Sequence, residues 1–216
     1  MTVDETRARY LEAVLSGSRR EAFGVVDLAR QAGLGIRALY LDVFQPAMRE
    51  VGRLWQENRI TVADEHLATA ITQAAMARLY EELFHASPEP GPLLVAACAD
   101  QERHELGLRM ICDVLEMEGW DTVFLGASVP VEDLVRMVRA RRPQVVALSA
   151  SIAPHVARVR EAIRAIREAE PHGAPLIAVG GRAFADDPAL AERLGADLTA
   201  RDALQAAELL KEKFPA

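Results

Sequence analysis

Short, largely apolar runs alternate with amphipathic stretches in the second part of the chain, and this alternation constrains the fold most strongly. The runs have the length and composition of strands that are buried on both faces of a sheet. They cover residues 93–99, 122–127, 145–151 and 176–181, with a weaker fifth run at 196–200. The helical patterns between the first four runs cover residues 105–119, 131–142 and 156–170. Strands that alternate with helices predict a doubly wound, flavodoxin-like, five-stranded parallel sheet, whose ligands bind at the carboxyl ends of the strands.

The first 84 residues carry only helical periodicity. Leu11, Val14 and Leu15 recur at helical spacing after Asp4, which we expect to cap the first helix. The remaining predicted helices run from the N-cap Ser18 to Gly33, over residues 36–55, and from Thr61 to about residue 84. Short connections favour antiparallel neighbours, so the pattern predicts an N-terminal four-helix bundle.

Residues 85–92 contain three prolines and a glycine, and this composition predicts a linker. The sequence thus predicts a helical bundle over residues 1–84 and a sheet domain over residues 93–216.

The charge balance argues against direct nucleic-acid binding. Lys and Arg number 25 against 32 for Asp and Glu, which gives a net charge of −7, and duplex affinity depends largely on phosphate neutralisation. We expect a cytoplasmic protein without a membrane span, because the N-terminus lacks an apolar signal core and no apolar run is long enough. Cys98 and Cys112 lie in apolar or helical stretches, so we expect inert core thiols.

Polar and small residues follow three of the predicted strands. The segment after the first strand contains Glu102, His104 and Gly107, the third run ends in Ser149 and Ser151, and the fourth ends in Gly180 and Gly181. We expect all three segments to lie at one edge of the sheet.

This arrangement can be read in two ways. A neutral imidazole such as that of His104 can ligate a metal if a partner holds its other ring nitrogen, and Glu102 is placed for that. Gly107 lies one helical turn further on, where a missing side chain admits something bulky. Taken singly, however, these features equally describe an exposed loop histidine, strand-end caps and an ordinary turn. The sequence supplies no second His or Cys for a protein-only zinc site.

Residues 93–213 resemble the cobalamin-binding domain of methionine synthases, corrinoid methyltransferase subunits and mutases. Its fingerprint is D-x-H-x-x-G, then S-x-L, then G-G, and this chain reads Glu102-x-His104-x-x-Gly107, Ser149-x-Ser151 and Gly180-Gly181. The resemblance implies that His104 replaces the cofactor's own base as the lower ligand of cobalt (base-off/His-on). It also implies that the displaced base enters a slot lined by the serine and glycine segments. Two departures are Glu102 for Asp and Ser151 for Leu.

The helical part carries a second motif, in which Trp55 is followed after nine residues by Glu65 and His66. Composition alone is also consistent with a tryptophan that packs in the bundle core and a Glu-His pair that caps a helix or lies on its surface. The spacing, however, is similar to the cap of light-sensing cobalamin photoreceptors, a class related to light-dependent transcriptional repressors. In that class these residues surround the 5′-deoxyadenosyl group, which implies adenosylcobalamin as the cofactor, with methylcobalamin or hydroxocobalamin as alternatives.

Two features separate this chain from those repressors. Its bundle begins almost at Met1, so we expect no DNA-binding domain and a signal through a protein partner, such as a transcriptional regulator, or through homo-oligomers. Gln56 stands where some members carry a histidine that binds the photolysed cobalt.

Three functions stay open: an adenosylcobalamin-dependent light sensor, a corrinoid carrier subunit of a methyltransferase system, and a cobalamin-sensing regulator or storage protein. The sequence shows no nucleophile–base pair and no phosphate-binding loop, the patterns that would indicate catalysis by side chains alone. We expect the other histidines to be solvated: His85, His155 and His172.

Overall fold

The computed structural model describes residues 1–83, 91–187 and 189–214. The chain divides into two compact units, Met1–Phe84 and His85–Ala216. Residues 85–90 of the predicted linker lie outside the described residues.

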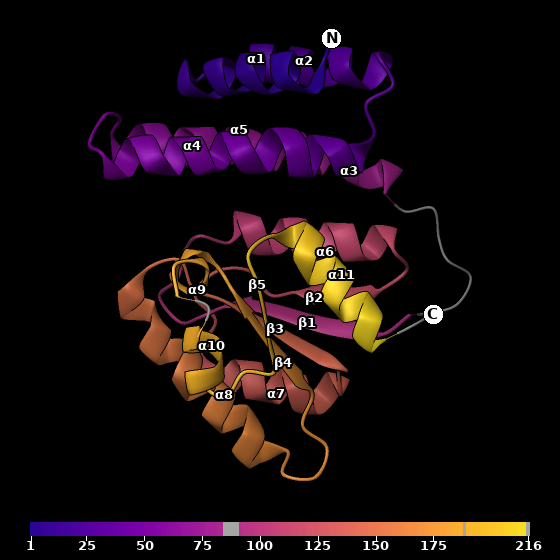
Figure 1. The fold of residues 1–216 in the computed structure, drawn as a ribbon, viewed down its shortest axis with the longest axis vertical. Coiled ribbons are helices and arrows are strands. Elements are labelled where there is room, and N and C mark those ends of the chain that lie inside the picture. The colour runs from indigo at the N-terminus through magenta and orange to yellow at the C-terminus, as the bar shows by residue number, and fades with distance from the viewer. Residues whose placement is uncertain (84–90, 188, 215–216) are drawn as a thin grey trace. The chain divides into compact units, whose positions relative to one another are not determined.

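The first unit is helical, as predicted. Its longer helices are α1 (Val3–Leu15), α2 (Arg19–Gln31), α4 (Gln45–Gln56) and α5 (Val62–Leu79). Shorter segments are α3 (Ile36–Ala38), the π-helix η1 (Leu39–Phe44) and the 3₁₀ turn η2 (Tyr80–Glu82). Within this unit α1 packs against α2, α4 and α5 (Figure 1).

Side-chain caps mark the starts of α1, α2 and α5. The hydroxyl of Thr2 accepts a hydrogen bond from the backbone of Glu5, whose carboxylate accepts one from the backbone of Thr2. The prediction of Asp4 as the cap is therefore wrong: the extended backbone lies at Thr2, and Asp4 falls inside the first turn, where its charge suits the helix dipole. Ser18 caps α2, as predicted, and Thr61, the predicted start of the last helix of this unit, caps α5.

The predicted helix over residues 36–55 is interrupted by the π-helix η1. Pro46 has no N–H to bond the carbonyl of Asp42, and the backbone N–H of Gln45 reaches back five residues to the carbonyl of Tyr40. The wider turn belongs to a segment whose aromatic side chains are wholly buried. The rings of Tyr10 and Phe44 lie 4.8 Å apart, and the buried hydroxyl of Tyr10 donates to Thr72 at 3.0 Å.

The second unit is a parallel sheet in the order β2-β1-β3-β4-β5, which confirms the predicted flavodoxin-like topology. Its strands are β1 (Leu93–Cys98), β2 (Asp121–Phe124), β3 (Val145–Ser149), β4 (Leu176–Gly180) and β5 (Leu198–Ala200). Its helices are α6 (Leu106–Met117), α7 (Val131–Arg141), α8 (Val156–Ala169), α9 (Arg182–Ala185), α10 (Ala189–Arg193) and α11 (Ala203–Lys213). The short helices α9 and α10 were not predicted.

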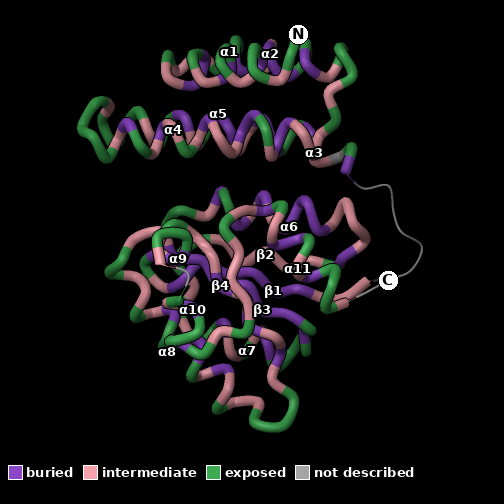
Figure 2. Tube along the Cα trace, viewed as in Figure 1, coloured by how far each residue is buried: buried purple, intermediate pink, exposed green. Residues whose placement is uncertain are grey.

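Helices cover both faces of this sheet, with α6 and α11 on one side and α7 and α8 on the other (Figure 1). Strands β1 and β3 are almost entirely buried, as Figure 2 shows. Their apolar runs follow from this double cover, because no side chain of β3 and only the first of β1 escapes full burial. Cys98 and Cys112 are both buried, as predicted. Among the described residues, no helix is long and apolar enough to cross a bilayer.

Candidate functional site

The carboxyl ends of β1, β3 and β4 lie side by side at one edge of the sheet. In the parallel register Cys98 pairs with Ser149, and Ser149 pairs with Gly180. The chain leaves β1 toward β2 and leaves β3 toward β4, so the strand order reverses between β1 and β3. Ligands of open parallel sheets bind at such a reversal, and the three predicted segments meet there.

Glu102 is wholly buried and joins the loop after β1 to the loop after β3. Its Oε1 atom accepts a hydrogen bond from the backbone N–H of His104 at 2.9 Å and also contacts Nδ1 of the His104 ring. Its Oε2 atom accepts one from the backbone N–H of Ser151 at 2.7 Å and lies 3.0 Å from Nδ1 of His155. Four donors thus surround one carboxylate, which saturates its two oxygens.

These hydrogen bonds determine where the protons lie on Glu102 and on the ring nitrogens that face it. Burial acts to raise the pKa of the Glu102 carboxyl, but the hydrogen bonds from His104, Ser151 and His155 outweigh it and hold this pKa below its usual range. Glu102 is therefore a carboxylate at neutral pH and can only accept hydrogen bonds. The Nδ1 atoms that face it must carry protons, so in a neutral His104 ring Nε2 bears the lone pair that a metal would use.

The surroundings of His104 fit a large cofactor that brings its own in-plane metal ligands. The side chain of His104 is 41% exposed, although its partner Glu102 is wholly buried. Gly107 is the second residue of α6 and is exposed. Apart from its own helix and chain neighbours, no atom of the described residues lies within 4 Å of the position that a Cβ at Gly107 would take. An oriented, partly exposed imidazole thus lies three residues from a glycine whose missing side chain leaves room.

The loop after β2 holds the Glu102 segment from the other side. The backbone N–H of Gln101 donates to the Ser128 hydroxyl at 3.0 Å, and the backbone N–H of Ser128 donates to the carbonyl of Glu102 at 2.9 Å. Both Gln101 and Ser128 adopt left-handed backbone angles, with φ of 69° and 52°. Strained residues of this kind gather at functional sites. Neither was predicted, because the strain depends on contacts between distant loops.

The remaining predicted residues of this edge play unequal parts. Ser149 is buried as the last residue of β3, whereas Ser151 reaches the cluster through its backbone N–H. Gly181 has φ of +97°, and a Cβ there would lie 2.3 Å from the carbonyl oxygen of Ala150. The missing side chain of Gly181 therefore first serves the close approach of two backbones. At Gly180 a Cβ would make only an ordinary contact.

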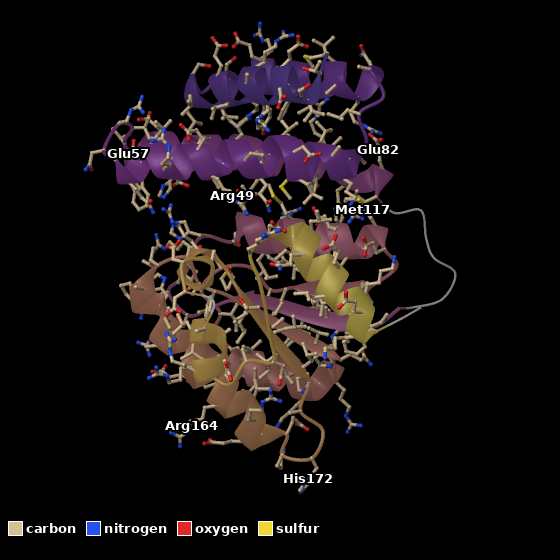
Figure 3. The ribbon with its side chains drawn as sticks, in the orientation of Figure 1. Arg49, Glu57, Glu82, Met117, Arg164 and His172 are labelled. Carbon is tan, nitrogen blue, oxygen red and sulfur yellow. The ribbon has the colours of Figure 1, made fainter. Side chains whose placement is uncertain are left out.

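His155 corrects one expectation. The sequence predicts that it is solvated, but its side chain is 15% exposed and bonds to Glu102. The signal in the sequence is weak: a histidine after a proline, six residues beyond the end of β3. His172 is exposed as predicted, on the loop between α8 and β4 (Figure 3), and His85 lies outside the described residues.

The helical unit places its motif residues around one helix connection. Trp55 lies near the end of α4, and Glu65 and His66 lie in the first two turns of α5. The carboxylate of Glu65 is 16% exposed, accepts a hydrogen bond from the hydroxyl of Thr69 at 3.0 Å, and has the ring of the exposed His66 at 3.6 Å. Trp55 is half-buried, so it is not simply a core residue of this unit.

Two family models and several known proteins are similar to this chain. A family model described as a B12 binding domain matches residues 92–208, and a second model with the same description matches residues 6–80. The HTH-type transcriptional repressor CarH of Myxococcus xanthus is 37% identical over 71% of this chain and 50% of the repressor. The repressor CarA of the same organism is 35% identical over 68% of this chain and 48% of its own length. The chain thus spans about half the length of these two relatives.

Other similar proteins match over most of their length. Trimethylamine corrinoid protein 1 of Methanosarcina acetivorans is 23% identical over 197 residues, which cover 90% of each chain. The structure of the Methanosarcina barkeri monomethylamine corrinoid protein matches with a TM-score of 0.87 at 20% identity, over 99% of this chain and 100% of that one. This likeness shows the fold. Because the family model over residues 92–208 covers more than half of the sequence, the chain belongs to the B12 binding domain family.

Proposed function

We propose that this protein is a light sensor that uses adenosylcobalamin, held base-off with His104 as the lower ligand of cobalt. Cobalamin binding follows from the family, and the adenosyl form and the sensing role are the proposal. Adenosylcobalamin supplies a cobalt–carbon bond that visible light breaks. The residues proposed to bind it are Glu102, His104, Gly107, Ser149, Ser151, Gly180, Gly181, Trp55, Glu65 and His66.

The lower side of this proposal rests on the Glu102–His104 pair. A wholly buried carboxylate fixes Nδ1 of an exposed imidazole, which leaves Nε2 of the neutral ring as the nitrogen that would bind a metal. The negative carboxylate also raises the basicity of the imidazole, and a more basic ring is a better ligand.

The upper side rests on the Trp55-x9-Glu65-His66 spacing, which is the single observation that favours light sensing. The half-buried indole of Trp55 offers a flat apolar surface to an adenosyl group. The Glu65 carboxylate accepts a hydrogen bond from Thr69 and has capacity to accept others from ribose hydroxyls. The 35–37% identity to the CarA and CarH repressors supports the same reading.

Adenosyl recognition predicts a selective binding defect. We expect Trp55→Ala and Glu65→Ala to weaken adenosylcobalamin binding about tenfold, or about 1.4 kcal/mol, and hydroxocobalamin binding by less than about twofold. Only the adenosyl form has a group for these side chains to contact. Titration of the apo-protein with both cofactors measures this, and Glu57→Ala, in the exposed turn after α4, is the control (Figure 3). Equal losses for both cofactors would show that Trp55 and Glu65 only support the helical unit.

The sensing role predicts a structural response to green light. Loss of the adenosyl group takes away the packing partner of Trp55, and a gap of side-chain size costs a few kcal/mol, enough to shift an equilibrium by more than tenfold. We expect the adenosylcobalamin-loaded protein to change its elution volume or scattering curve on illumination. Size-exclusion chromatography with small-angle scattering tests this, with hydroxocobalamin-loaded protein as the light control. A bleached spectrum with unchanged elution and scattering contradicts the sensing role.

Such a sensor signals through a protein partner, such as a transcriptional regulator, or through its own assembly. The −7 net charge favours a protein over nucleic acid as the direct partner.

A second candidate is a corrinoid carrier that serves methyltransferases. The observation in its favour is that trimethylamine corrinoid protein 1 is similar to this chain over 197 residues, which include both units. A carrier shields a small methyl group and does not need Glu65 and His66. Purified holo-protein that carries methylcobalamin and shows no structural response to light would favour this candidate.

A further inference from the structure

Glu102 receives hydrogen bonds from two histidines, and only His104 has a part in the proposed function. The second, His155, lies 53 residues beyond Glu102, after β3. Each ring faces a different carboxylate oxygen, with His104 at Oε1 and His155 at Oε2. The carboxylate therefore lies between two imidazoles.

We propose that His155 is a positioning residue, which fixes the carboxylate of Glu102 and through it the orientation of the His104 ring on cobalt. This inference rests on the His-on part of the proposed function. It assigns to this chain a His104–Glu102–His155 triad in which the third member is an imidazole.

The longer side chain of Glu102 explains why a second histidine is needed to hold its carboxylate. A glutamate has one more rotatable bond than the aspartate of the fingerprint, so a single anchored oxygen leaves its carboxylate free to turn. The backbone N–H of Ser151 and the ring of His155 hold the opposite oxygen at 2.7 Å and 3.0 Å. With both oxygens held, Oε1 has a fixed place from which to orient Nδ1 of His104.

His155 is itself held firmly. It ends the 3₁₀ turn η3 (Ala153–His155), where its backbone N–H donates to the carbonyl of Ile152 at 3.0 Å. Pro154, the residue directly before His155, has a φ angle that its own ring fixes. His155 also stands at the N-cap position of α8, yet its side chain makes no capping bond to that helix. The imidazole of His155 instead hydrogen-bonds to Glu102.

Two substitutions separate the hydrogen bond from the bulk of the ring. In His155→Asn the amide nitrogen takes nearly the place of Nδ1 and can still donate to Glu102. His155→Leu fills similar space without a donor. His172→Ala is the control, because His172 is an exposed histidine of the same unit.

The test loads each full-length variant with cobalamin, reduces it to cob(II)alamin and records electron paramagnetic resonance spectra. Protein labelled with nitrogen-15 assigns the coupling nitrogen to the protein and not to the cofactor's own base. We expect His155→Leu to lose at least half of the His-on signal and about tenfold in cobalamin affinity. We expect His155→Asn and His172→Ala to keep both near wild type. A purely structural role would lower the thermal stability of the apo-protein and leave the His-on share of the bound cofactor unchanged.

The outcomes separate this inference from the function on which it rests. If wild type shows the labelled nitrogen and His155→Leu shows the same His-on share, the positioning role of His155 is wrong and the His104 ligand stands. If His155→Leu does not fold, loss of the His-on signal in His155→Asn overturns the proposal, and its retention supports donation to Glu102 as the property that matters. If wild type itself shows no protein nitrogen on cobalt, the His-on assignment fails, and the role of His155 falls with it.

Discussion

His104→Ala should abolish the coupling of protein nitrogen to cobalt and leave the fold intact. The side chain is 41% exposed, so its removal opens no cavity in the core. Its partner Glu102 keeps the backbone N–H groups of His104 and Ser151 and the ring of His155, so the buried carboxylate stays satisfied. The substitution therefore separates ligation from folding.

The same labelled-protein spectra measure this effect. Wild type loaded with cob(II)alamin should show splitting that changes from a triplet to a doublet when nitrogen-15 replaces nitrogen-14 in the protein. His104→Ala should show no dependence on the label, and apo-protein unfolding should match wild type within about 0.5 kcal/mol, as is usual for exposed positions. A label-dependent splitting in His104→Ala would mean that another residue ligates cobalt.

Much of the sheet unit could be predicted because its strands are buried on both faces. A strand such as β3 is buried on both faces, so its sequence is a nearly continuous apolar run that is easily told from a loop. The helices between the strands leave few possible orders of the strands in the sheet. The pairing of Glu102 with His104 could be predicted for a similar reason. The two residues are neighbours in sequence, so the contact needs only local geometry.

Features that depend on distant contacts could not be predicted in this way. His155 meets Glu102 only because β1 and β3 are neighbours in the sheet, and the pattern around residue 155 is that of an ordinary helix start. The predictions of the first helix cap and of a continuous helix through η1 were wrong for local reasons. In each case two candidate bonding partners lie within a turn of each other, and periodicity does not choose between them.

The two glycines of the fingerprint that lie after β1 and β4 should respond in opposite ways to the same added methyl group. We expect Gly181→Ala to destabilise the apo-protein by on the order of 3 kcal/mol. At φ of +97° and ψ of 170° an L-residue is strained, and its Cβ would lie 2.3 Å from a backbone oxygen that cannot rotate away. Relief requires β3 and β4 to separate at the edge where the site lies.

Gly107→Ala is the matched variant. Because only its own helix and chain neighbours lie within 4 Å of that Cβ among the described residues, the fold should tolerate it, and alanine's helix propensity should leave stability unchanged or up to about 1 kcal/mol higher. Its cost should appear only with cofactor, as a loss of cobalamin affinity of about tenfold, or about 1.4 kcal/mol. Denaturant unfolding of both apo-variants and cobalamin titration of Gly107→Ala test this pair. Unchanged affinity in Gly107→Ala would mean that the space beside His104 is not where the corrin lies. A stable Gly181→Ala would mean that the backbone approach at Ala150 is looser than the geometry of this edge implies.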